Sequence, residues 1–156
     1  MIRSWFVLAS VWLVLVLFLG SAYFAAQETA RFVLPVLNLL MPAAPSAQLH
    51  GVHLVLRKLA HLAEYAVLAV LWFKALHRAG GRTPRAAAWM ALSICLACAF
   101  ADETHQSTLP SRQGSARDFV IDAFGATAML TLVRSRRTAG DRQGRLGQTV
   151  AAEPAD

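Results

Sequence analysis

Residues 5–26 form one long apolar run that contains no charged side chain. A membrane-spanning helix needs about 20 mostly apolar residues to cross about 30 Å of hydrocarbon. The run is too long for the apolar region of a signal peptide, and no A-x-A motif ends it, so we interpret it as a span. The chain as a whole is 56% hydrophobic and 15% charged, whereas soluble domains average roughly 25% charged residues. These features predict an integral membrane protein and exclude an intrinsically disordered chain.

Three further apolar blocks are shorter than the first, and each carries polar residues at one end. They cover residues 59–76, 86–101 and 119–133. Residues 27–58 have apolar side chains at near-helical spacing but are interrupted by prolines, so we expect them to lie at the membrane interface. The predicted fold class is therefore all-α, a four-transmembrane-helix bundle with an interfacial segment between helices 1 and 2.

The distribution of basic residues predicts the orientation of the chain, because Lys and Arg are enriched in short cytoplasmic loops. Four of them and no acidic residue occur around the connection between the second and third blocks, namely Lys74, Arg78, Arg82 and Arg85. The membrane domain of residues 1–137 is followed by residues 138–156, which lack apolar periodicity and are expected to form a disordered basic tail near anionic lipids. Both termini are thus predicted to be cytoplasmic. We interpret the net charge of +6 as a topology signal and expect no nucleic-acid partner.

With this orientation, most remaining polar residues gather at the extracytoplasmic ends of the second, third and fourth spans. At about 100° per residue, polar positions three or four apart share one helix face, so each span turns a polar stripe toward the others. Ionisable side chains in a bilayer are costly and are expected to face the bundle interior. The candidate ligand-binding residues are Lys58, His61, Tyr65, Asp102, Glu103, Gln106, Arg112, Asp118 and Asp122.

The spacing of these residues resembles that of the VanZ-like family of small bacterial membrane proteins. The matching pattern is Lys58-x2-His61-x3-Tyr65, then Asp102-Glu103-x2-Gln106-x3-Pro110-x-Arg112-x5-Asp118-x6-Gly125. The resemblance implies a multi-pass protein of the bacterial cytoplasmic membrane and, through the founding member, a link to resistance against teicoplanin-type glycopeptide antibiotics. The family usually has Asn where Asp122 stands, so this chain carries an additional carboxylate.

Two interpretations of the polar cluster remain open. One is a structural network of ion pairs that locks the helices together, since polar contacts hold membrane helices where lipid provides no hydrophobic force. The other is a site for an anionic envelope lipid or a lipid-linked cell-wall precursor, with Lys58 and Arg112 on the phosphate. A catalytic variant of this site would use His61 or Glu103 as general base. No catalytic motif in the sequence identifies a particular reaction.

Metal binding is the least favoured chemistry. The pair His61-x2-Glu64, with acidic residues on the other spans, is similar to the carboxylate sites of helix bundles, but those sites repeat the Glu-x-x-His pair on two helices. His50-x2-His53 has the separation of two ligands without a matching acid or cysteine pair, and we expect both imidazoles to be solvated. The sequence therefore predicts no metal and no cofactor.

Overall fold

The computed structural model describes residues 2–108 and 116–151, and nearly all of them are helical. No strand occurs within these two ranges, so the all-α prediction is confirmed. The elements in chain order are α1 (Ile2–Leu19), the 3₁₀ turn η1 (Ala22–Phe24), α2 (Ala26–Leu40), α3 (Ser46–Lys74), the π-helical turn η2 (Ala75–Ala79), α4 (Pro84–Ser107) and α5 (Ala116–Ala151).

The turn between α3 and α4 is explained by the residues within it. Helix α3 runs through η2 and stops at Gly80, and Gly81 takes a φ of 62°, a conformation that glycine adopts without a steric penalty. Thr83 then caps α4 by accepting a hydrogen bond from the Ala86 N–H at 3.3 Å, and Pro84 occupies the first turn of the helix. The chain therefore reverses within the basic connection that the sequence predicted between the second and third blocks.

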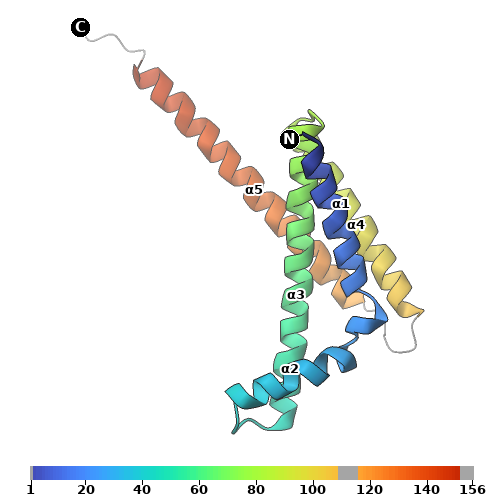
Figure 1. Cartoon of the computed structure of the whole chain (residues 1–156). Helices are drawn as coiled ribbons and strands as arrows, with labels where there is room; N and C mark the ends of the chain where they lie inside the picture. Colours follow the sequence, from blue (N-terminus) through green and yellow to red (C-terminus); the bar gives the residue numbers. More distant parts are fainter. Residues whose placement is uncertain (1, 109–115, 152–156) are drawn as a thin grey trace.

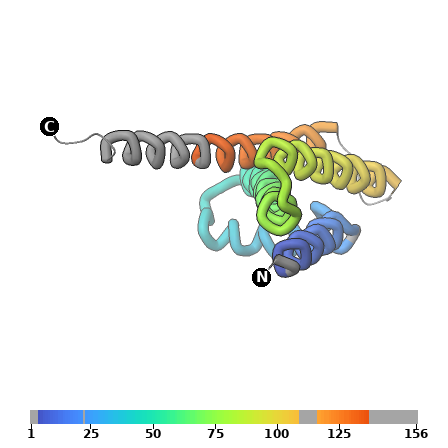
Figure 2. Tube along the Cα trace, turned by 90° about the horizontal axis from the view of Figure 1, so that it is seen from above, coloured from blue at the N-terminus to red at the C-terminus, as the bar shows by residue number. Residues whose placement is uncertain are grey.

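Helix α3 is the centre of the bundle and contacts α1, α2, α4 and α5. The view from above shows α3 between α1 and the pair of α4 and α5 (Figure 2). In Figure 1, the N-terminus lies at the same end of the bundle as the turn between α3 and α4, while α2 folds across the opposite end, beside the beginning of α3. This arrangement separates a basic end of the bundle from the end at which α2 and the first turns of α3 lie.

Helix α4 packs through a stripe of small residues. Ala87, Ala91, Cys95 and Ala99 recur every four residues and are all buried. Small side chains allow close approach between helices, as is typical of packing in a membrane. Large apolar side chains on the outer surface of the bundle are exposed, for example Trp89 on α4 and others on α1 and α5. Exposed apolar surface of this kind is suited to contact with lipid.

Among the described residues, two helices are long and apolar enough to cross a membrane by length and composition, Ser46–Ala79 and Pro84–Ser107. A third apolar helix, Ser4–Leu19, is shorter. The apolar part of α5 is interrupted by acidic residues in its first two turns, Asp118 and Asp122. The count of four spans and the interfacial position of residues 27–58 stay predictions.

Two expected boundaries differ from the structure. Residues 46–58 belong to α3 instead of a separate segment, because no proline occurs after Pro45 to interrupt the helix that continues into the predicted span. Helix α5 continues through Ala151, beyond residue 137, where the sequence predicted the start of a disordered tail. The Ala, Arg and Gln residues of this segment favour a helix even though they form no apolar stripe.

Candidate functional site

The outer part of the predicted site is an ion pair that joins α3 to α5. Lys58 Nζ lies 2.8 Å from Asp118 Oδ1. The Lys58 side chain is 49% exposed and the Asp118 side chain 32%. Exposed pairs of this kind contribute from nothing to about 1 kcal/mol in water. The pairing follows the predicted stripes on the two helices, and it is the contact that the helix-locking interpretation requires.

One turn further along both helices, His61 faces Asp122. The distance from His61 Nδ1 to Asp122 Oδ1 is 3.6 Å, just beyond hydrogen-bond length, and the side chains are 16% and 1% exposed. Neither oxygen of Asp122 has a hydrogen-bond partner in the described part of the chain. Helices α3 and α5 come this close because residue 125 is glycine, and a Cβ at that position would overlap the carbonyl oxygen of Leu62.

A second buried carboxylate lies on α4. Gln106 Nε2 donates to Asp102 Oδ2 at 2.6 Å, and both residues are buried. The carboxylate of Asp102 lies against the end of α1, where a Cβ on Gly20 would overlap it. Asp102 and Gln106 thus share a face as predicted, and their contacts are with each other and with α1.

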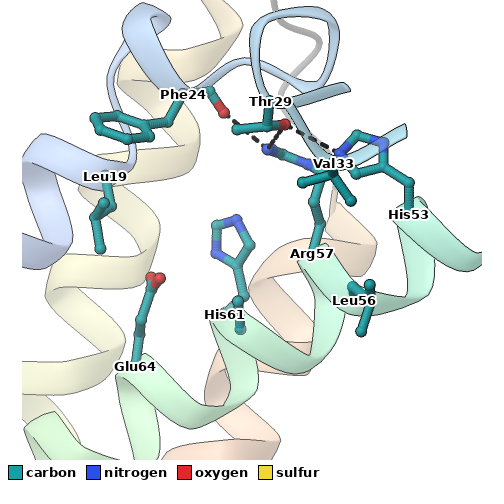
Figure 3. Close-up of a pocket in the computed structure, with 10 residues that line it drawn as sticks. Leu19, Phe24, Thr29, Val33, His53, Leu56, Arg57, His61 and Glu64 are labelled. Carbon is teal, nitrogen blue, oxygen red and sulfur yellow. Dashed lines mark hydrogen bonds between the residues drawn. The ribbon is translucent and has the colours of Figure 1, made fainter. Parts of the chain in front are cut away.

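A cavity of about 250 Å³ lies on the α1 and α2 side of α3. One part of its wall is apolar, formed by Leu19, Phe24, Val33, Leu56 and Ala60. The rest is polar, formed by Thr29, His53, Arg57, His61 and Glu64. Figure 3 shows His61 and Glu64 pointing into this space from α3. His61 is therefore bordered by Asp122 on α5 and by the cavity.

Arg57 organises the polar part of the cavity wall. Its Nη1 donates to the carbonyl oxygen of Phe24 at 2.7 Å and to Thr29 Oγ1 at 3.2 Å, and Thr29 Oγ1 is also 3.1 Å from His53 Nε2 (Figure 3). These contacts attach η1 and α2 to α3. On the other side, the indole N–H of Trp12 donates to the carbonyl oxygen of Glu64 at 3.0 Å, which attaches α1 to the same helix.

The structure brings together some of the predicted residues and separates others. Of the predicted ligand-binding residues, His61 alone is among the described residues that line the cavity. Tyr65 is completely buried in the apolar core, and Glu103, the second catalytic candidate, does not line the cavity. Arg112 lies outside the described residues, so its predicted role stays a prediction.

Sequence reasoning missed several cavity residues. Arg57 and Thr29 were not identified, Glu64 was considered only for a metal, and His53 was expected to be solvated but is 3% exposed. The spacing Arg57-x3-His61-x2-Glu64 places these three side chains on one helix face and was a usable signal. No group of three or more His, Cys, Asp or Glu residues that could hold a metal ion occurs in the described parts of the chain.

Comparison with known proteins gives one family match. The family described as VanZ/LLP1 matches residues 5–137. No curated protein and no solved structure matches the sequence.

Proposed function

The chain belongs to the VanZ/LLP1 family, and we propose that it is a four-span protein of the bacterial cytoplasmic membrane that binds the headgroup of an anionic envelope lipid or lipid-linked cell-wall precursor. The cavity beside His61 is the observation that carries this proposal. Its divided wall matches an amphiphilic ligand, with apolar side chains for the hydrocarbon and polar ones for the headgroup.

The surroundings of the cavity support a ligand that comes from the membrane. Helix α2, which forms one wall, keeps large apolar side chains exposed, including Phe32, Val36 and Leu39. An amphipathic helix with such a face is suited to lie in the membrane interface. The guanidinium of Arg57, held by hydrogen bonds to Phe24 and Thr29, places a positive charge in the wall of the cavity. Arginine is well suited to phosphate recognition.

Native mass spectrometry of the purified protein tests this proposal. The wild type should retain an anionic phospholipid under conditions that remove bulk detergent, and Arg57→Gln should lose it while remaining folded. Arg31→Gln is the matched control, because Arg31 is an exposed arginine on α2 that pairs with Glu28 and does not line the cavity. Equal lipid retention by wild type and Arg57→Gln would refute the proposed site.

The proposed topology has its own test. In the proposed topology both termini and the turn between α3 and α4 lie in the cytoplasm. Alkaline phosphatase fused after Arg117 should therefore be active, and the same enzyme fused after Arg82 should be inactive. The reverse pattern would place the cavity on the cytoplasmic side. The link to glycopeptide sensitivity predicts that a susceptible bacterium expressing the wild type tolerates more teicoplanin than one expressing Arg57→Gln.

A structural role is the second candidate, and the pair of Lys58 and Asp118 favours it. In this alternative the polar residues only hold α3, α4 and α5 together. Substitutions at the cavity would then lower expression and thermal stability first, and lipid retention would fall only in proportion to the loss of folded protein.

A further inference from the structure

Asp122 is a buried acid that faces an imidazole. It is 1% exposed, and His61 Nδ1 lies 3.6 Å from its Oδ1. A buried carboxylate is costly unless a charged or hydrogen-bonding partner stabilises it. The gap is short enough for a small rotation of His61 to close, as occurs when loosely aligned polar groups tighten around a ligand. His61 is therefore the side chain on which Asp122 can act most directly.

The consequence for His61 concerns the protonation of its two ring nitrogens. A carboxylate facing Nδ1 favours the tautomer that carries the proton on Nδ1. The other nitrogen, Nε2, is then a hydrogen-bond acceptor. Because His61 lines the cavity and its Nδ1 faces Asp122, we expect Nε2 to be the nitrogen that is available to a ligand in the cavity.

The acceptor at His61 lies between two groups of opposite charge on the same helix face. Arg57 is four residues before His61 and Glu64 three residues after it, and all three line the cavity. At a rise of 1.5 Å per residue these positions are separated along α3 by about 6 Å and about 4.5 Å. With His61 in the tautomer that Asp122 favours, the order along the helix face is the guanidinium of Arg57, an imidazole acceptor and the carboxylate of Glu64.

We infer that the cavity recognises a phosphate that carries neighbouring hydroxyl groups, as a glycerol or sugar phosphate does, with Asp122 as the positioning residue for His61. The inference rests on the proposed function and specifies its ligand. The phosphate lies by Arg57, and the hydroxyl groups donate to His61 Nε2 and to the carboxylate of Glu64. Hydroxyl groups can donate both to an imidazole and to a carboxylate. An ammonium group paired with Glu64 is the competing headgroup chemistry, and the lipid titration distinguishes the two.

Binding of lipids with matched acyl chains tests the ligand class. Purified full-length protein is titrated with three lipids. Phosphatidylglycerol offers a phosphate with neighbouring hydroxyl groups, phosphatidic acid offers a phosphate without a headgroup alcohol, and phosphatidylethanolamine offers a phosphate with an amine. Phosphatidylglycerol should bind more tightly than phosphatidic acid, by about threefold to tenfold for each hydrogen bond that its hydroxyl groups make. Free glycerol 1-phosphate should bind more weakly than phosphatidylglycerol if the source of the headgroup is a lipid, whereas equal affinity would assign the site to a soluble ligand of the same chemistry.

The role of Asp122 is tested separately by Asp122→Asn, which removes the charge and keeps the size. The ¹⁵N shifts of His61, assigned with His61→Gln, should show the Nδ1-protonated tautomer in the wild type and loss of that preference in Asp122→Asn. The same variant should show a smaller preference for phosphatidylglycerol over phosphatidic acid, because the acceptor at His61 is weakened while Glu64 remains. Glu28→Gln is the control, since it makes the same acid-to-amide change on the exposed side of α2, and it should alter neither measurement.

Three results would overturn the inference. They are equal affinity for phosphatidylglycerol and phosphatidic acid, tightest binding of phosphatidylethanolamine, and a His61 tautomer that does not respond to Asp122→Asn. In the first case the proposed function still stands if binding depends on Arg57. If no phosphate lipid binds in an Arg57-dependent manner, the proposed function fails together with the inference.

Discussion

Replacement of Gly125 by alanine would test whether the close approach of α3 and α5 creates the site. A Cβ at residue 125 would overlap the carbonyl oxygen of Leu62 and lie 3.2 Å from its carbonyl carbon. These are backbone atoms of a helix, so they cannot rotate away as a flexible side chain would. The two helices must therefore move apart to accept the methyl group.

Two effects of opposite sign determine the magnitude. Alanine stabilises a helix by about 0.5–1 kcal/mol relative to glycine. Overpacking of a well-packed contact costs about 1–3 kcal/mol. The overlap with backbone places Gly125→Ala toward the upper part of the second range, which leaves a net loss of roughly 1–2 kcal/mol. For a chain of this size, each kcal/mol corresponds to about 2–4 °C, so the melting temperature should fall by roughly 2–8 °C.

Thermal unfolding followed by far-UV circular dichroism in detergent provides the measurement. Gly51→Ala is the matched control, because Gly51 lies on α3 and a Cβ there would meet nothing within 4 Å. That variant should be as stable as the wild type or slightly more stable. The separation of the helices should also move Asp122 away from His61 and reduce the preference for phosphatidylglycerol. A Gly125→Ala protein that melts at or above the wild-type temperature would refute the packing argument.

Three other substitutions test neighbouring contacts. In Gly20→Ala the new methyl group would overlap the carboxylate of Asp102, and the displaced acid would also lose its hydrogen bond to Gln106. We expect the free energy of unfolding, measured by thermal unfolding, to fall by about 1–3 kcal/mol. An unchanged melting temperature would show that α1 is free to shift. A double-mutant cycle of Lys58→Met and Asp118→Asn should give a coupling energy of at most about 1 kcal/mol, since both side chains are partly exposed. A coupling of several kcal/mol would favour the helix-locking function. Trp12→Phe removes the hydrogen bond to the Glu64 carbonyl and should lower the free energy of unfolding by about 1 kcal/mol, with lipid affinity unchanged. A large loss of lipid affinity would mean that α1 also positions the residues that line the cavity.

The contacts between α3 and α5 could be predicted because they depend on helical periodicity and chain direction. Lys58 and His61 share a face of α3, and Asp118 and Asp122 share a face of α5. When two such helices run in the same direction, the outer pair and the inner pair fall at matching depths, and the structure contains both contacts. The bond between Asp102 and Gln106 follows from the same four-residue spacing within one helix.

The cavity could not be predicted in the same way. It depends on α2 folding back against α3, and the contacts that hold this arrangement join residues far apart in sequence, such as Arg57 with Phe24. Periodicity places a side chain on a helix face but does not say which other helix covers that face. For the same reason His53 was expected to be solvated, although α2 buries it with Thr29.

Asp118 and Asp122 lie one turn apart on α5, and their surroundings separate a structural role from a ligand-binding one. The side chain of Asp118 is 32% exposed and is paired with Lys58. The contribution of this pair to stability is therefore small, because water can solvate either charge in place of the partner. The carboxylate of Asp122 is 1% exposed, and its charge is expensive to bury. A chain that required only a lock between α3 and α5 would lose little by placing an uncharged residue there. A carboxylate at this position, directed at an imidazole that lines a cavity, therefore supports a binding site over a purely structural network.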